Sequence, residues 1–266
     1  MKAKKYAICF NTKIQNTIDV KDSLLQIIQS QGMEVEALEI DNLRSGFDFA
    51  FVIGGDGTIL RAARFFAEYG IPIFGVNLGR LGFLSQWSSD DLEEVVAKII
   101  NEHFHIEERL MLQSEKHFAL NDFVVKGNSL ARATKLTLKI NGKAVCDYLA
   151  DGLIISTATG STAYGLSAGG PVIAPGLGVM EIVPICPHTM TARPLVISAD
   201  SVISISMEDR DSGFVLSADG QDCFEVYSEI EIRKAPFKAK VALLEDFDFY
   251  SILRDKLHWG TSPAKI

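Results

Sequence analysis

The chain has 266 residues, of which 47% are hydrophobic and 23% are charged, and its formal net charge at pH 7 is −8. This length allows one large domain or two modest ones, and the composition is that of a folded globular protein. The acidic balance, with a pI of about 5.2, argues against a nucleic-acid-binding protein or one that docks on anionic membranes, because such surfaces need clustered basic residues. We therefore expect neither a nucleic-acid partner nor a membrane partner.

Targeting signals and cysteine spacing give no sign of export or of metal binding. The apolar stretch Tyr6–Phe10 is too short for a signal-peptide core, and no run approaches the roughly 20 apolar residues of a membrane span. The four cysteines, Cys9, Cys146, Cys186 and Cys223, are far apart and form no CxxC pair. We therefore expect a cytoplasmic protein with neither a zinc site nor a disulfide framework.

The first third of the chain alternates strand and helix patterns. Apolar runs predict strands, and apolar residues at helical spacing predict helices between them. The predicted strands are Tyr6–Phe10, Val35–Ile40, Phe49–Ile53 and Ile71–Val76, and the predicted helices lie near Val20–Gln31, over Ile59–Tyr69 and near Asp90–Ile100. This alternation is typical of a doubly wound α/β domain with a mostly parallel sheet, which we predict over residues 1–104.

One strand-to-helix turn in this region carries a lone carboxylate among glycines. The residues Gly54 to Thr58, in the order Gly-Gly-Asp-Gly-Thr, directly follow the apolar strand Phe49–Ile53. Ligands bind at the carboxyl ends of parallel strands, and glycines let backbone N–H groups approach a phosphate. Asp56 is then a candidate general base for an attacking hydroxyl, or a magnesium ligand. The alternative is a plain turn in which Asp56 only caps the next helix.

After about residue 105 the hydrophobic period changes from helical to two. Alternation over Ala133–Ile140, followed by Asn141-Gly142, indicates a hairpin that returns over Ala144–Leu149. Further strands are predicted at Ala119–Val125, Leu153–Ser156, Val202–Met207, Phe214–Ala218, Ile230–Arg233 and Val241–Leu244. We predict a mostly antiparallel β domain over residues 105–248, and a terminal segment, 249–266, whose helix Phe249–Leu257 packs back on the first domain.

A second turn rich in glycine and hydroxyl groups follows another buried strand. Asp151 precedes the strand Leu153–Ser156, and residues 157–164 read Thr-Ala-Thr-Gly-Ser-Thr-Ala-Tyr. Many small hydrogen-bonding side chains suit the ribose, phosphate or base edge of a nucleotide, although such a run between strands is also typical of a solvated loop. Asn121-Asp122 and Asp219-Gly220, taken alone, are typical turn residues.

Together and in this order, these segments resemble the NAD kinase family. The similarity runs from about Val52 to about Asp222. It covers the family's diglycine signature at Gly54 to Thr58, the next block at Gly75 to Leu84 and the nucleotide-binding block at Asp151 to Tyr164. The diglycine signature alone is shared with lipid kinases and, more loosely, with phosphofructokinases, so the combination carries the resemblance.

The resemblance implies phosphorylation of the adenosine ribose 2′-hydroxyl of NAD by ATP, with Mg²⁺, to give NADP. Inorganic polyphosphate is an alternative donor. By the family pattern Asp56 is the catalytic base, and no set of protein metal ligands is expected. The residues expected to bind substrate and nucleotide are Gly55, Gly57, Thr58, Arg61, Phe74, Asn121, Asp122, Asp151, Thr159, Ser161, Thr162, Ala163 and Tyr164. Arg61 also has the alternative of a solvated helix residue. The family is typically homotetrameric, with the β-rich half in subunit contacts and part of the pocket supplied by a neighbour.

Two positions depart from the family pattern. Asp122 stands where the family usually has Glu, and its side chain is one methylene shorter, so a hydrogen bond to ribose becomes longer or water-bridged. Ala158 replaces a common proline and removes a fixed φ from the turn. Two alternatives to an NAD kinase stay open, namely a diglycine-motif lipid kinase and a non-catalytic nucleotide-binding sensor. The lack of a basic run or a long amphipathic helix argues against the first, and retention of Asp56 argues against the second.

Overall fold

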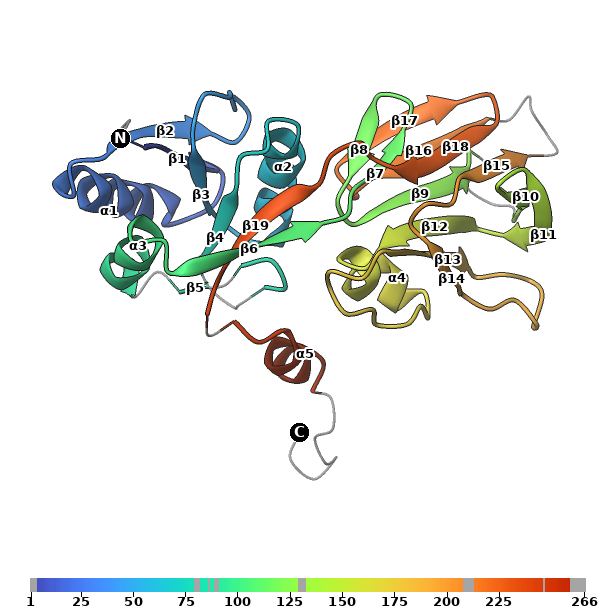
Figure 1. Ribbon diagram of the computed structural model, residues 1–266. Coiled ribbons are helices and arrows are strands. Elements are labelled where there is room, and N and C mark those ends of the chain that lie inside the picture. Colours follow the sequence, from blue (N-terminus) through green and yellow to red (C-terminus); the bar gives the residue numbers. More distant parts are fainter. Residues whose placement is uncertain are drawn as a thin grey trace. The chain divides into compact units, whose positions relative to one another are not determined.

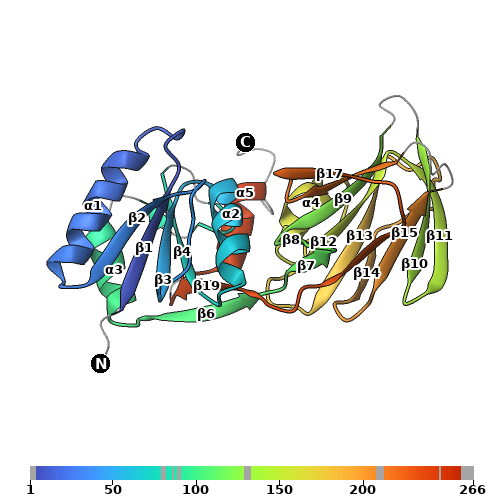
Figure 2. The same ribbon diagram turned by 90° about the horizontal axis from the view of Figure 1, so that it is seen from above.

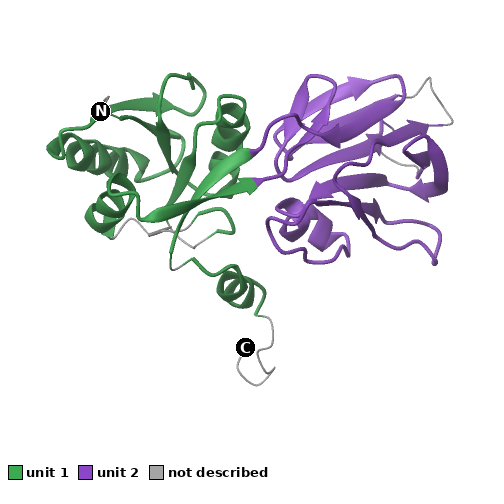
Figure 3. Cartoon of the chain, viewed as in Figure 1, with its two compact units in different colours: residues 1–108, 239–266 green, residues 109–238 purple. Residues whose placement is uncertain are grey.

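The structure, a computed structural model, divides into two compact units. Unit 1 comprises residues 1–108 and 239–266, and unit 2 comprises residues 109–238 (Figure 3). No helix within the described part of the chain is long and apolar enough to cross a membrane. The structure describes residues 4–78, 82–85, 87–88, 91–128, 133–207, 213–245 and 247–258.

Unit 1 is built on a mostly parallel sheet. Its strands are β1 (Lys5–Phe10), β2 (Glu34–Glu39), β3 (Phe49–Ile53), β4 (Ile73–Asn77), β5 (Trp87–Ser88), β6 (Phe104–Arg109) and β19 (Ala239–Leu244). They hydrogen-bond in the order β2-β1-β3-β4-β19-β6, and β5 also pairs with β4 (Figure 1). The pairs β1–β2, β1–β3, β3–β4, β4–β5 and β4–β19 are parallel. The predicted parallel α/β fold of this half is therefore confirmed.

Helices cover both faces of this sheet (Figure 2). They are α1 (Thr17–Ser30), α2 (Asp56–Ala67) and α3 (Leu92–Ile100), and a further helix, α5 (Phe249–Leu257), follows β19. Phe49, Phe51 and Ile53 on one face of β3 share a core cluster with apolar side chains of α1 and α3. The helix α2 contacts β3, β4 and β19. Because both faces are covered, β3 is apolar at every position, which is why its pattern is continuous and not alternating.

One strand of the unit 1 sheet comes from the C-terminal part of the chain. Val241 of β19 pairs in parallel with Ile73 of β4, and Ala242 and Leu244 lie in the unit 1 core. The sequence prediction had placed this strand in the β-rich half, and the structure differs because β19 returns to the parallel sheet. In α5, the Phe249 ring lies 6.3 Å from the Phe83 ring, centroid to centroid.

Unit 2 contains two antiparallel sheets. Its strands are β7 (Leu112–Ser114), β8 (His117–Ala119), β9 (Asp122–Gly127), β10 (Thr134–Ile140), β11 (Lys143–Ala150), β12 (Gly152–Thr157), β13 (Val179–Ile185), β14 (Leu195–Ser198), β15 (Ile203–Met207), β16 (Phe214–Ala218), β17 (Asp222–Val226) and β18 (Ile230–Lys234). One sheet has the order β11-β10-β15-β18-β7-β8, and the other has the order β14-β13-β12-β9-β16-β17. The predicted antiparallel character of this half is confirmed.

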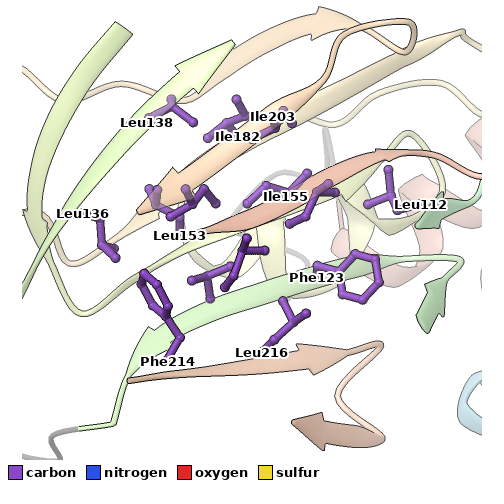
Figure 4. Packing of buried hydrophobic residues seen from close by; sticks show 14 of the residues in the cluster. Leu112, Phe123, Leu136, Leu138, Leu153, Ile155, Ile182, Ile203, Phe214 and Leu216 are labelled. Atoms are coloured by element: carbon purple, nitrogen blue, oxygen red, sulfur yellow. The ribbon is translucent and has the colours of Figure 1, made fainter. Parts of the chain in front are cut away.

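The two sheets of unit 2 share one apolar core (Figure 4). Leu136 and Ile203 of one sheet lie in the same buried cluster as Phe123 and Ile155 of the other. The second sheet buries its opposite face as well, where Val124 on β9 and its neighbours on β12 and β13 form a smaller cluster. Alternate residues of β9, β12 and β13 therefore face away from the shared core, and this outer face holds the polar residues of the candidate site.

Candidate functional site

The glycine-rich turn after β3 is shaped by backbone conformations that need glycine. Gly54 has φ +149°, and a Cβ there would lie 2.7 Å from the Thr58 hydroxyl oxygen. Gly55 is the residue before the first turn of α2, and its carbonyl accepts hydrogen bonds from the N–H groups of Thr58 (2.9 Å) and Ile59 (3.2 Å). Gly55 and Gly57 are exposed, while Thr58 is buried. The start of α2 therefore presents exposed backbone at its positive dipole end, which suits an anionic ligand.

Asp56 is held by main-chain donors from a distant loop. It is the first residue of α2 and is half-buried, and the N-cap position before it is occupied by Gly55. Its Oδ2 accepts from the Phe83 N–H at 3.1 Å and its Oδ1 accepts from the Leu84 N–H at 3.2 Å. Each carboxylate oxygen has two lone pairs, so Asp56 can still accept a proton or hydrogen bond from a substrate hydroxyl. The geometry supports an oriented base and does not support the capping alternative.

The loop that holds Asp56 is itself anchored by two buried polar side chains. Ser85 Oγ accepts from the Gly82 N–H at 2.7 Å and from Asn77 Nδ2 at 3.1 Å. Asn77 lies at the end of β4, so its side chain connects this loop to the sheet. Only the resemblance pointed to this block, since no pattern in the residues alone marks Ser85. Gly79, Arg80 and Leu81 of the block lie outside the described residues.

Arg61 and Phe74 both contact other side chains of unit 1. Arg61 Nη1 lies 2.5 Å from Asp41 Oδ1, with both side chains about half exposed. Arg61 is therefore a half-exposed residue of α2 in a surface ion pair, and its contact with a phosphate stays a prediction. Phe74 is fully buried, with its ring centroid 6.2 Å from that of Phe51. A ligand contact of Phe74 stays a prediction.

In unit 2, the hydroxyl-rich turn after β12 packs on the backbone of Asn121. Thr157 Oγ1 donates to the Leu120 carbonyl at 2.6 Å and accepts from the Gly160 N–H at 3.1 Å. A Cβ at Gly160 would lie 2.2 Å from the Asn121 carbonyl oxygen, so this close approach requires glycine. The Asn121 carbonyl also accepts from the Thr157 N–H at 2.9 Å. The two predicted binding segments, 121–122 and 157–164, are therefore brought together.

The members of this turn divide into structural and accessible residues. Ser161 is fully buried, and its Oγ donates to the Ala158 carbonyl (2.8 Å) and accepts from the Ile173 N–H (3.0 Å). Ser161 thus shapes the turn, and a role as a direct ligand contact stays a prediction. Thr162 and Ala163 are half-buried. Tyr164 is 39% exposed, and its ring is accessible to a ligand.

Two basic side chains adjoin this turn, and sequence reasoning missed both. Arg109 is 2% exposed, and its Nη1 lies 3.3 Å from the Thr159 hydroxyl oxygen, which accepts its hydrogen bond. The Lys126 ammonium lies 5.5 Å from the centroid of the Tyr164 ring. Neither residue belongs to a motif, so only the register of the strands could have placed them near the turn.

A row of polar residues crosses the outer face of the second sheet beside this turn. Ser156 of β12 is paired in register with Asp122 of β9 on one side and with Glu181 of β13 on the other. Glu181 is fully buried, and neither of its carboxylate oxygens has a hydrogen-bond partner among the described residues. Burial raises the pKa of Asp122 to about 7, and the nearby Asp219 carboxylate adds to this shift. Burial, followed by the charge of Asp122, raises the pKa of Glu181 to about 7.

Asp151 is exposed and directly precedes the first residue of β12. The next residue, Gly152, pairs with Lys126 of β9, and the Lys126 ammonium lies against the Tyr164 ring. A contact between Asp151 and the dinucleotide stays a prediction.

Family models match both halves of the chain. Residues 5–104 match the ATP-NAD kinase N-terminal domain, and residues 120–244 match the ATP-NAD kinase C-terminal domain. Among curated relatives, an NAD kinase of Clostridium botulinum (strain Kyoto / Type A2) is 36% identical over 98% of this chain and 99% of its own length. An NAD kinase of Geotalea daltonii is 38% identical over 83% of this chain and 81% of its own length.

Solved structures show the same likeness. The NAD kinase from Archaeoglobus fulgidus in complex with ATP has a TM-score of 0.80 at 28% identity and covers 96% of this chain and 98% of its own. Yeast NADH kinase complexed with NADH is similar in fold, with a TM-score of 0.85 at 23% identity over 98% of this chain and 89% of its own. With both halves matched and full-length relatives above one-third identity, this chain belongs to the NAD kinase family.

Proposed function

We propose that this protein transfers the γ-phosphoryl group of ATP to the adenosine ribose 2′-hydroxyl of NAD, giving NADP, with Asp56 as the general base. One observation carries the assignment of the base. Asp56 lies at the start of α2, and its carboxylate accepts hydrogen bonds from the Phe83 and Leu84 N–H groups, which orient it. Relatives over nearly the full length of the chain are NAD kinases, which supports the substrate and the reaction.

Phosphoryl transfer requires that the protein position the two substrates and neutralise charge on the phosphates. Phosphoryl transfer passes through a loose transition state in which charge collects on the phosphoryl oxygens, so oriented N–H donors and a helix dipole stabilise it. The exposed backbone at Gly55, at the start of α2, provides such donors. Asp56 accepts the 2′-hydroxyl proton as the new P–O bond forms, and the ATP β-phosphate leaves with the bonding electrons.

Unit 2 supplies the residues that we assign to dinucleotide binding. Asn121 and Asp122 provide an amide and a carboxyl group for ribose hydroxyls. Thr159, Thr162 and Ala163 line the turn that Gly160 brings against Asn121. Tyr164 offers an exposed aromatic ring on which a base can stack. The archaeal relative holds ATP, which supports ATP as the donor here, and polyphosphate remains a second donor to test.

Mg²⁺ is proposed as an ion that arrives with the nucleotide. Magnesium in kinases is held by one or two carboxylates together with substrate phosphates, and it neutralises phosphate charge. Asp56 is the carboxylate of the phosphate-binding turn, and the described residues contain no cluster of three His, Cys, Asp or Glu side chains suited to a metal. This donor set fits a nucleotide-bound ion better than a metal cage built by the protein. Asp56 and the phosphate oxygens would hold it.

We further propose that the protein is a cytoplasmic homotetramer. The exposure of Asp151 supports self-association, because this carboxylate, which directly precedes β12, is open to contact from a neighbouring chain. In a closed oligomer, Asp151 of one chain can complete a neighbour's dinucleotide pocket. Light scattering of the purified protein tests the subunit number, and a monomer would contradict this assembly.

The function is tested by one assay with four substrate combinations. Purified protein is incubated with Mg²⁺, with NAD or NADH, and with ATP or polyphosphate, and NADP(H) is followed through a coupled dehydrogenase. We expect NADP from NAD and ATP, abolished by EDTA and restored by excess Mg²⁺. No NADP from any combination, with a folded protein, would reject the kinase assignment.

A further inference from the structure

The Asp219 carboxylate binds three consecutive main-chain N–H groups of the turn that carries Asn121 and Asp122. Oδ2 accepts from the Leu120 N–H at 3.0 Å. Oδ1 accepts from the Asn121 N–H at 2.7 Å and from the Asp122 N–H at 3.1 Å. Hydrogen bonds to an ionised carboxylate are roughly twice as strong as neutral ones, so this contact fixes the turn firmly.

The hairpin between β16 and β17 delivers this carboxylate. Asp219 and Gly220 have φ values of +52° and +64°, which is the conformation of a tight hairpin turn. Ala218 pairs with Phe123 of β9, and the Asp219 N–H donates to the Asp122 carbonyl at 2.9 Å. This hydrogen bond continues the pairing of β16 with β9 by one residue. The Asp219 side chain therefore reaches the N–H groups at the start of β9. In the sequence, Asp-Gly signals only a hairpin.

We propose that Asp219 is a positioning residue of the NAD site, which acts on the dinucleotide through the turn that carries Asn121 and Asp122. Both main-chain groups of Asn121 are hydrogen-bonded. Its N–H donates to Asp219, and its carbonyl accepts from the Thr157 N–H and from Ser156 Oγ. With this backbone fixed, the Asn121 amide and the Asp122 carboxyl keep one orientation toward a ligand, and little entropy is lost on binding. The inference rests on the proposed function for the identity of that ligand.

Asp219 also acts on Asp122 through its charge. Three charged side chains lie around this end of the sheet: Asp219 after β16, Glu181 on β13, and Arg109, which binds Thr159. Lys126, further along β9, lies against the Tyr164 ring. The negative charge of Asp219 is the second cause, after burial, of the raised pKa of Asp122. Removing that charge eases the ionisation of Asp122, so any property that follows this ionisation shifts to lower pH.

The test is equilibrium binding of NAD to Asp219→Asn across pH 5 to 9, by calorimetry and without ATP. Asn can accept through its oxygen but not through its nitrogen, so the variant loses part of the N–H contact and the whole charge. At pH 9, where Asp122 is ionised in both proteins, we expect Kd for NAD to rise about 10-fold. We expect the midpoint of the pH dependence to fall, and Asp122→Asn to remove that midpoint.

The matched control is Asp200→Asn. Asp200 also lies in a turn of unit 2, but its side chain is 76% exposed and it pairs with Lys234 at the surface. We expect the Kd for NAD of Asp200→Asn, and the midpoint of its pH dependence, to equal those of the wild type. A merely structural role for Asp219 would lower the melting temperature without moving the midpoint.

Two results would overturn the inference in different ways. If the wild type binds NAD and Asp219→Asn has the same Kd and midpoint, the role of Asp219 is rejected and the kinase assignment stands. If the wild type does not bind NAD, both the role of Asp219 and the kinase assignment are rejected. Should Asp219→Asn not fold, amide exchange of the wild type decides. The Leu120, Asn121 and Asp122 amides should all be protected at neutral pH, and rapid exchange of all three would reject the contact.

Discussion

Gly82 lies so close to Asp56 that a Cβ on the glycine would be 1.9 Å from Oδ1 of the carboxylate. Asp56 is the first residue of α2 and Gly82 lies in the loop after β4, where the adjoining Phe83 and Leu84 N–H groups are the donors that orient Asp56. The absence of a side chain at position 82 therefore sets the orientation of the proposed base.

Gly82→Ala should lower kcat while leaving the fold intact. The new methyl group displaces the Asp56 carboxylate and breaks its two main-chain hydrogen bonds, and misplacement of a catalytic group by about 1 Å can cost about 100-fold in rate. Steady-state kinetics and a melting curve measure the two effects. Gly178→Ala is the control, because a Cβ there meets nothing within 4 Å. Unchanged kcat in Gly82→Ala would show that the orientation of Asp56 is unimportant.

Asp56→Asn should reduce kcat by roughly 10² to 10⁴, the range typical of losing a positioned general base. The amide oxygen can still accept one main-chain hydrogen bond, so we expect the Kd for NAD to stay within about 3-fold of the wild type. Single-turnover kinetics separates the chemical step from product release. Asp22→Asn, on the exposed surface of α1, controls for loss of charge. A near-normal chemical step would reject Asp56 as the base.

Tyr164→Ala should weaken NAD binding, and Tyr164→Phe should preserve it. The ring is 39% exposed and lies beside the Lys126 ammonium, so it is available for stacking. Stacking of a base on an aromatic side chain is worth about 1 to 3 kcal/mol. Calorimetry with NAD measures the change. Tyr250→Ala is the control, because Tyr250 lies on α5 with 59% exposure. Equal affinity in Tyr164→Ala and the wild type would contradict the stacking role.

Glu181→Gln should stabilise the protein, and more so as the pH rises. Burial raises the pKa of Glu181 to about 7 in the folded protein, from an ordinary value near 4.5. The folded state therefore keeps a proton that the unfolded state releases, and the free energy of unfolding falls between about pH 4.5 and pH 7. Glutamine resembles the protonated acid and does not titrate.

We expect the stability gain of Glu181→Gln to be small at pH 4.5 and on the order of 1 to 3 kcal/mol at pH 8. Urea unfolding at several pH values measures it. Glu231→Gln, on the exposed part of β18, should show no such pH dependence. A gain of the same size at pH 4.5 and pH 8 would show that Glu181 is not protonated in the folded protein.

Local patterns predicted most of the elements of this fold. Continuous apolar runs such as Phe49–Ile53 identified parallel strands, because a strand covered on both faces has no polar side. Period-two alternation identified the antiparallel half, and Asn141-Gly142 marked a hairpin that the structure contains. The strand predicted at Val241–Leu244 was placed with the β-rich half but pairs with β4 of the parallel sheet, because its composition suits either sheet and β4 lies far away in sequence.

The sequence by itself determined the residue types of the proposed chemistry and the local turns that carry them, because glycine freedom, strand period and helix spacing act over a few residues. Only the tertiary structure decided which distant groups meet those turns. It brought Gly82 and the Leu84 N–H to Asp56, Arg109 to Thr159, and the Asp219 carboxylate to the turn before β9. Such contacts depend on strand order and register, which are fixed by packing of the whole sheet and leave no local pattern.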